Sequence, residues 1–450
     1  MTSPHATLDL PKALGDNLLL RLATEDDIDA VADLNERGLL EEHESSGIFS
    51  TWTRDLLSGR HPTATVTDCI LVEDTASGQI VSATTLIPQI WRYEDIPFGV
   101  GRPEMVSTDK AYRRRGLVRA IFGAFHDLSA AYGHQVQAIT GIRWFYRQFD
   151  YEYALLRSRG RALPIDEIVP LKEDETEPYR IRPATEADIP TIVRLYEHQC
   201  ARKLVTTIID EVRWQYDLFG QTPGSAQNLR AYTITDQEDR PIGYYTTPPE
   251  MFGSSLYVWE LGLEENISLY RLLPTVLRAL KQQGDALVEK NEAQNESFKF
   301  IQLALSPHHP AYEALDAKLQ PPKPPYAFYV RLADVPAFIR HIAPVLERRL
   351  ADSVMRGFSG SLNLSFFRSG LQLTFEEGRL TQATDWSVPD DHKDWEGAHF
   401  PPLVFLKLLF GYRSLDELRY AYPDCAADEE ATLLLNILFP KQDSWVLPLG

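Results

Sequence analysis

The sequence predicts an α/β (α+β) chain in which two tandem copies of one mixed-sheet fold precede a smaller C-terminal α+β domain. Residues 181–189 (IRPATEADI) repeat residues 20–28 (LRLATEDDI), and a proline-rich stretch at 321–325 precedes a further set of strand-like and helical runs. A repeat at domain length indicates a second copy of a fold, because solenoid repeats recur about every 20–50 residues. We therefore expect domains at 1–170, 171–330 and 331–450.

The first copy opens with a strand over 18–22 and a helix in which Ile28, Val31 and Leu34 recur at helical spacing. Thr24 and Asp27 form a capping signal at the start of that helix. Residues 65–74 and 80–89 have strand patterns. An acidic cluster follows the helix, as either a solvated face or a site that attracts a cationic amine: Glu36, Glu41, Glu42 and Glu44, with His43.

A basic turn connects the next strand, which ends near Thr108, to a helical pattern over 117–132. The turn contains Arg113, Arg114, Arg115 and Gly116. The first NH groups of a helix have no intrahelical partners, and the helix dipole favours negative charge there. Glycine permits close approach to the backbone, and arginine donates charge-assisted bonds to phosphate oxygens. The turn therefore predicts an anion site, with an ordinary solvated loop as the alternative.

The turn resembles motif A of the GNAT acyltransferases, Gln/Arg-x-x-Gly-x-Gly/Ala, on Arg113 and Gly116, with Val118 in place of the small residue. A second resemblance follows the strand over 136–140, where WFYRQFDY (144–151) is similar to the FYxxxGF element of that family. Asp150 stands at the glycine of the element and tolerates positive φ. The resemblance implies acetyl-CoA as cosubstrate and Tyr146 as the general acid that protonates the thiolate. It places these residues around the coenzyme: Val106, Thr108, Arg113, Arg114, Arg115, Gly116, Leu117 and Val118.

The second copy keeps a strand-like run over 256–263 and a helical pattern over 269–280, but its connecting turn is Glu264-Glu265-Asn266-Ile267-Ser268. Two acidic residues at this point would repel a pyrophosphate. We expect a fold retained without coenzyme, and hence one coenzyme per chain. Residues 360–364, 370–376 and 378–383 read as strands of a small sheet, and 333–350, 403–409, 415–420 and 428–438 read as helices.

The order of the domains resembles the Eis family of N-acetyltransferases, whose C-terminal domain is sterol-carrier-protein-like. The resemblance implies two tandem GNAT-like mixed-sheet domains, a homo-oligomer up to a hexamer, and a base supplied by the terminal carboxylate, which here belongs to Gly450. The apolar run Trp445-Val446-Leu447 indicates that the tail docks. The acceptor is a primary amine, whether of an aminoglycoside, a polyamine, a peptide or a lysine. The alternatives are a CoA-binding sensor and a lipid-binding protein without transfer activity.

The composition predicts a soluble cytoplasmic protein. The 450 residues carry a formal charge of -19, which argues against a general nucleic-acid binder. Cys69, Cys200 and Cys425 have neither metal-ligand spacing nor a disulfide pattern, so we expect no metal and a reducing compartment. No apolar run approaches the roughly 20 residues that span a bilayer, and no signal peptide is expected.

Overall fold

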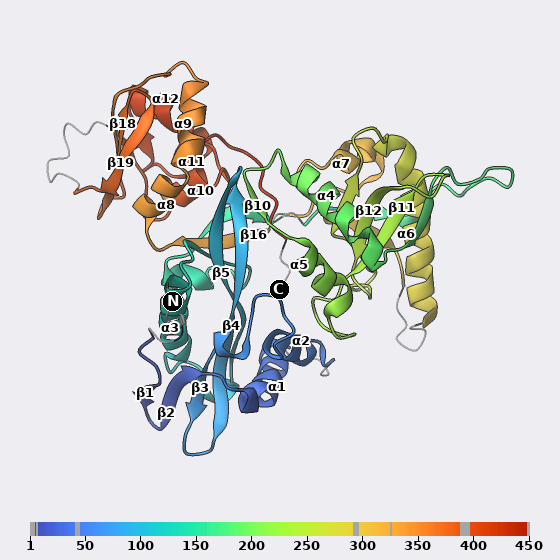
Figure 1. The fold of residues 1–450 in the computed structure, drawn as a ribbon, viewed down its shortest axis with the longest axis horizontal. Coiled ribbons are helices and arrows are strands. Elements are labelled where there is room, and N and C mark those ends of the chain that lie inside the picture. The colour runs from blue at the N-terminus through green and yellow to red at the C-terminus, as the bar shows by residue number, and fades with distance from the viewer. Residues whose placement is uncertain are drawn as a thin grey trace.

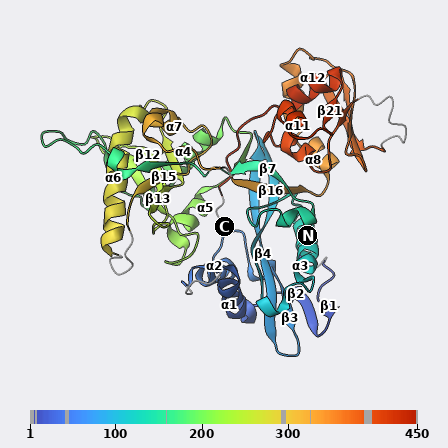
Figure 2. The same ribbon diagram turned by 180° about the vertical axis from the view of Figure 1, so that it is seen from behind.

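The chain folds into three lobes, which Figures 1 and 2 show from opposite sides. The computed structural model describes residues 5, 8–40, 46–157, 159–290, 297–324, 326–387 and 397–447. The first lobe contains the N-terminal strands and α1–α3, the second contains α4–α7, and the third contains α8–α12. The fold is the predicted mixed α/β architecture, with tandem GNAT-like copies and a C-terminal α+β domain.

The first lobe is built on a nine-stranded sheet with the order β1-β2-β3-β4-β5-β6-β16-β7, in which β10 pairs with the end of β4. Strand β3 alternates between the two faces. Leu71 packs on the face covered by α1 and α2, whereas Ile70 and Val72 pack on the face covered by α3. The elements are β1 Lys12–Gly15, β2 Leu18–Leu22, α1 Ile28–Leu39, α2 Ile48–Leu57, β3 Cys69–Asp74, β4 Gln79–Tyr93, β5 Ile96–Thr108, α3 Leu117–Ala131, β6 Val136–Ile139, β7 Glu152–Arg157, β10 Val205–Thr207 and β16 Tyr326–Leu332.

The second lobe holds a four-stranded sheet, β14-β12-β11-β9, and a three-stranded sheet, β13-β15-β8. The run at 256–263, predicted as one strand, is divided at Trp259 between these two sheets. The elements are β8 Arg161–Pro164, β9 Arg180–Pro183, α4 Ile189–Cys200, α5 Glu211–Gln215, β11 Arg230–Thr235, β12 Pro241–Thr247, β13 Ser255–Val258, β14 Glu260–Leu263, α6 Leu269–Lys290, β15 Phe300–Leu303 and α7 Pro310–Ala314.

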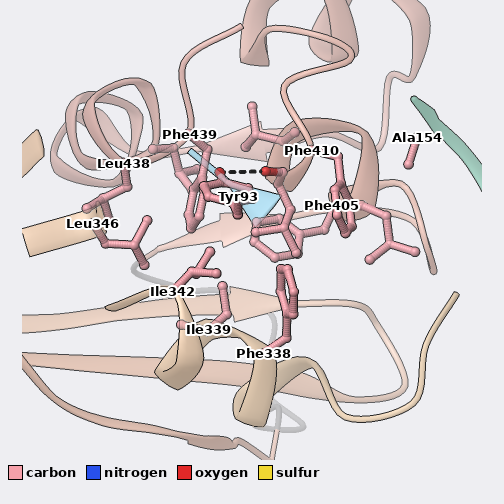
Figure 3. Close-up of a cluster of buried hydrophobic side chains, with 14 of the residues drawn as sticks. Tyr93, Ala154, Phe338, Ile339, Ile342, Leu346, Phe405, Phe410, Leu438 and Phe439 are labelled. Atoms are coloured by element: carbon pink, nitrogen blue, oxygen red, sulfur yellow. Dashed lines mark hydrogen bonds between the residues drawn. The ribbon is translucent and has the colours of Figure 1, made fainter. Parts of the chain in front are cut away.

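The third lobe contains a five-stranded sheet with the order β19-β18-β17-β20-β21. The tip of the β4–β5 hairpin enters its core, where Tyr93 lies among side chains that include Phe338, Phe410 and Phe439 (Figure 3). The Tyr93 hydroxyl donates to the Leu409 carbonyl at 2.9 Å. The elements are α8 Val335–His341, α9 Ala343–Ala351, β17 Gly360–Ser365, β18 Gly370–Glu376, β19 Arg379–Asp385, β20 Ala398–His399, α10 Phe405–Leu409, α11 Leu415–Ala421, β21 Ala426–Ala427 and α12 Glu429–Leu438.

Three strands cross the predicted domain limits. Strand β8 pairs with β15, β10 pairs with β4, and β16 lies between β6 and β7 of the first sheet. The limits at 170 and 330 therefore stay predictions. The predicted strand over 65–74 begins only at Cys69, because the Asp68 carboxylate accepts from the Thr65 NH at 2.8 Å and holds 66–68 in a 3₁₀ turn.

The repeated segments fold alike in detail. Arg21 donates two hydrogen bonds to Asp27, at 2.7 and 2.8 Å, and Asp27 accepts from the Thr24 NH at 2.8 Å. In the second copy, Arg182 donates to Asp188 twice at 2.7 Å, and Asp188 accepts from the Thr185 NH at 2.8 Å. The predicted Thr24–Asp27 cap is confirmed, and the same residues explain why the sequence repeat is visible.

Asp27→Asn is expected to destabilise the first lobe by about 1–3 kcal/mol, the usual cost of losing a hydrogen bond between charged groups. The bond from Arg21 lowers the pKa of Asp27 from 3.8 to about 2. The carboxylate therefore contributes stability above pH 3.8 that is lost as the pH falls towards 2. Calorimetric melting from pH 7 to pH 2.5 measures this. If the wild type and Asp27→Asn melt at the same temperature at pH 7, the pair makes no net contribution.

Candidate active site

Strands β5 and β6 diverge in the first lobe. They pair in parallel only at Val100–Val136 and Gly101–Gln137, after which β6 continues beside β16. The edge of β5 that faces β6 has no further strand partner over 102–108 in the described part of the chain. A bulge near Met105, at φ 54°, adds to the divergence. Unpaired backbone groups along this edge can bind an extended ligand arm.

The basic turn follows directly on β5. Gly116 has φ 77° and a Cβ there would meet no atom within 4 Å, so the backbone before α3 is open to a ligand. Among the described residues, no side chain caps the first NH groups of α3. Arg113, Arg114 and Arg115 are exposed, and the Arg115 guanidinium lies 4.8 Å from the centre of the Tyr112 ring. The open helix terminus and the three arginines together form a site that suits a pyrophosphate.

Tyr146 lies in a 3₁₀ turn, Phe145–Phe149, after β6. Its ring is 4% exposed and packs against Phe122 of α3, with ring centroids 5.6 Å apart. A Cβ at Gly141 would lie 2.6 Å from that ring, so glycine is required there. Burial raises the pKa of the Tyr146 phenol, which keeps it protonated and able to donate. Asp150 has φ 66°, which confirms the predicted turn conformation.

The structure brings several of the predicted residues together. Val106 of β5 and Val118 of α3 both pack against the aromatic cluster around Tyr146. Arg119 of α3 contacts the same cluster, because its guanidinium lies over the Phe149 ring at 5.5 Å. The Thr108 hydroxyl is turned towards the neighbouring strand and meets Ser82 Oγ at 2.7 Å. Of the candidate residues, Gly450 lies outside the described part of the chain.

A buried charged cluster adjoins Tyr146 and was not predicted. Glu104 of β5 is hydrogen-bonded to Arg102, and the Arg157 charge also acts on it. Burial raises the pKa of Glu104, while Arg102 and Arg157 oppose that rise. The Glu104 charge in turn adds to the raised pKa of Tyr146. The available sequence signal was a pair of charges, Arg102 and Glu104, within a run that reads as a buried strand.

The predicted acidic cluster has another role where it is described, and its first member, Glu36, lies within α1 rather than after it. Glu36 is 6% exposed, and its carboxylate accepts from the NH groups of Gly47, Phe49 and Ser50 at 2.7 to 3.0 Å. It caps α2, so the prediction of a solvated or amine-attracting Glu36 is wrong. Glu41, Glu42, His43 and Glu44 lie outside the described residues.

The turn of the second copy differs from that of the first. Glu264 forms an ion pair with Arg194 of α4, and Glu265 lies 3.3 Å from His198. An arginine of the second lobe therefore pairs with a glutamate where the first lobe exposes three arginines. The ion pairs leave the turn without the free positive charge that a pyrophosphate requires.

The C-terminal tail docks, as predicted, and the structure places its described part between the first two lobes. Trp445, Val446 and Leu447 are 7%, 4% and 3% exposed. The Trp445 NH donates to the Val205 carbonyl at 2.8 Å, and its indole Nε1 donates to Glu260 at 2.6 Å. The tail thus contacts β10, which itself extends the first sheet.

Comparison with known proteins identifies the first lobe. Residues 20–154 match the family model described as an acetyltransferase (GNAT) domain. The match covers β2 to β7, including the divergent strands, the basic turn and Tyr146. It supports acyl transfer as the general chemistry of the domain. No curated protein sequence matches this chain.

Solved structures share the fold along nearly the whole chain. A GCN5-related N-acetyltransferase from Kribbella flavida is 17% identical with a TM-score of 0.62, covering 98% of this chain and 100% of its own. One from Anabaena variabilis is 14% identical with a TM-score of 0.61, covering 95% and 99%. Eis1 from Mycobacterium abscessus is 13% identical with a TM-score of 0.58, covering 95% and 98%. At these identities the similarity concerns the fold alone.

No group of three or more His, Cys, Asp or Glu side chains among the described residues is arranged to hold a metal ion. None of their helices combines the length and the apolar character that a membrane crossing requires.

Proposed function

We propose that this protein transfers an acetyl group from acetyl-CoA to a primary amine. The observation that carries the proposal is the divergence of β5 and β6 directly beside an exposed arginine-glycine turn at the start of α3. Acetyl-CoA supplies the activated acyl group as a thioester. The backbone edge of Val106 to Thr108 binds the pantetheine arm, and the turn from Arg113 to Val118 binds the phosphates.

Tyr146 is the general acid in this proposal. Its buried phenol stays neutral at physiological pH and can therefore donate a proton to the departing sulfur. Packing against Phe122, Tyr151 and Tyr329 fixes the ring, with centroid distances of 5.6, 6.2 and 5.5 Å. Donation of a proton to the sulfur converts Tyr146 to a phenolate. The amine nitrogen loses a further proton once it is bonded to the acetyl carbon, and this second proton restores the phenol.

The acceptor must lose a proton before it attacks. An alkylammonium with a pKa of roughly 10.4 costs about 4–5 kcal/mol to deprotonate at pH 7. We propose the carboxylate of Gly450 as the base that offsets this cost. The docking of Trp445, Val446 and Leu447 supports the proposal, because it fixes the tail three residues before Gly450 against the lobe that adjoins the GNAT domain.

A thiol-release screen of an amine library with acetyl-CoA tests both the transfer reaction and the role of the terminal carboxylate. We expect the wild type to release CoA with at least one amine. A chain extended by a few residues beyond Gly450 moves the carboxylate away, and we expect it to lose about 100-fold or more in kcat/KM. Full activity of the extended chain would remove the terminal carboxylate from the mechanism. Binding of acetyl-CoA without release by any amine would instead favour a CoA-binding sensor.

A further inference from the structure

The second lobe contains a cavity of about 390 Å³ beside the point where its own strands diverge. Strands β13 and β15 pair in parallel up to Val258–Leu303, and β14 then leaves to pair with β12. Glu260 pairs across with Thr246, as Glu104 pairs with Thr85 in the first lobe. The second copy thus retains the divergence, while its acidic turn lacks the free positive charge that a coenzyme requires. The volume is in the range of small-molecule sites.

Aromatic side chains form much of the cavity wall. Phe252, Tyr257 and Trp259 make a row with ring centroids 5.4 and 5.1 Å apart, and Phe252 is 57% exposed at the edge. Trp214 and Trp445 also line the cavity. The fully buried indole Nε1 of Trp214 has no hydrogen-bond partner in the described part of the chain. A surface of this kind suits an aromatic body, and indole faces attract cations.

Glu260 is the acidic group of the cavity. It is 3% exposed, and within the described residues its one hydrogen bond comes from Trp445 Nε1 at 2.6 Å. Burial raises its pKa to about 8, although the bond from Trp445 lowers it. A carboxyl so poorly solvated gains strongly from a cationic partner. At another part of the cavity, Arg157 belongs to the cluster of Glu104 beside Tyr146.

We propose that this cavity binds the acceptor and selects arylalkylamines, with the aromatic ring on the Phe252–Trp259 row and the ammonium facing Glu260. The inference rests on the proposed function, and it names the acceptor class. Two lining residues relate the cavity to the groups proposed for proton transfer. Arg157 connects it to the surroundings of Tyr146, and Leu447, three residues before Gly450, lines it.

Calorimetric titration of the full chain without acetyl-CoA tests the site independently of transfer. We expect 2-phenylethylamine to bind at least about tenfold more tightly than propylamine, which lacks the aromatic ring, and than 2-phenylethanol, which lacks the ammonium group. Glu260→Gln keeps an acceptor for Trp445 and should weaken 2-phenylethylamine about tenfold or more while leaving 2-phenylethanol unchanged. Glu265→Gln, at an exposed acid outside the cavity, should change neither.

Phe252→Ala provides a second test that does not depend on a buried residue. We expect it to weaken 2-phenylethylamine about three- to tenfold and to leave propylamine unchanged, whereas Tyr270→Ala, at a tyrosine 74% exposed, should have no effect. Equal binding of the three probes, or unchanged affinity in both cavity variants, would overturn the proposal. If the probes bind as expected but no amine supports CoA release, the acetyl-transfer function fails and the acceptor role with it, leaving an amine-binding site.

Discussion

Tyr146→Phe is expected to lower kcat for acetyl transfer about 10²–10³-fold, within the range that a positioned general acid contributes. The substitution removes only the hydroxyl, so the packing against Phe122 and Tyr329 stays. Because the proposed coenzyme site lies elsewhere, at the β5 edge and the basic turn, we expect the KM for acetyl-CoA to change less than about threefold. Steady-state kinetics with the best amine from the screen measures both parameters.

Tyr151→Phe is the matched control. Tyr151 belongs to the same aromatic cluster, but its hydroxyl meets His126 Nε2 at 3.1 Å. We expect wild-type kcat within about threefold, since a neutral hydrogen bond is lost at some distance from the reacting atoms. Equal losses in the two variants would indicate a packing effect, and full activity of Tyr146→Phe would exclude this phenol as the acid.

Reversing the charge at the basic turn should have the second large effect. Arg113→Glu with Arg115→Glu replaces two potential phosphate partners by repelling groups beside the open backbone of Gly116. We expect the affinity for CoA to fall about 100-fold or more, since each charge-assisted bond contributes roughly tenfold or more. The loss should shrink in high salt, because exposed charges are screened.

Arg271→Glu gives the comparison in the second copy. Arg271 is an exposed arginine on α6, the helix that follows the acidic turn. We expect unchanged CoA affinity in this variant. Similar losses in both variants would show that net charge, rather than the turn before α3, determines binding. Titration of CoA at low and at high salt distinguishes these results.

The repeat and several of the helices were predictable because their signals are local, although the predicted helix over 333–350 is two helices, α8 and α9. The Thr24–Asp27 cap recurs as Thr185–Asp188 with the same hydrogen bonds. The nine-residue repeat therefore determines its own local conformation. The left-handed conformation of Asp150 also follows from residue type and motif position. These features depend on residues within a few positions of one another.

The remaining features depend on contacts between distant segments. Strand β16 enters the first sheet between β6 and β7, although more than 160 residues separate it from β7 in sequence, and no local pattern specifies that partner. Glu36 is of a residue type that is usually exposed, but its carboxylate is buried and caps α2. The Glu260–Trp445 bond joins residues 185 positions apart in the sequence. In each case the partner belongs to a segment that no local sequence pattern indicates.

The stoichiometry of CoA binding tests the central claim most directly. Isothermal titration of the full chain should give one CoA per chain, with binding abolished by the Arg113→Glu and Arg115→Glu pair and unaffected by Glu264→Gln. In the second lobe, Arg194 forms an ion pair with Glu264 of the corresponding turn. We therefore expect no CoA site in that lobe. Two CoA molecules per chain, or one that survives the double arginine reversal, would contradict the assignment of the coenzyme to the turn from Arg113 to Val118.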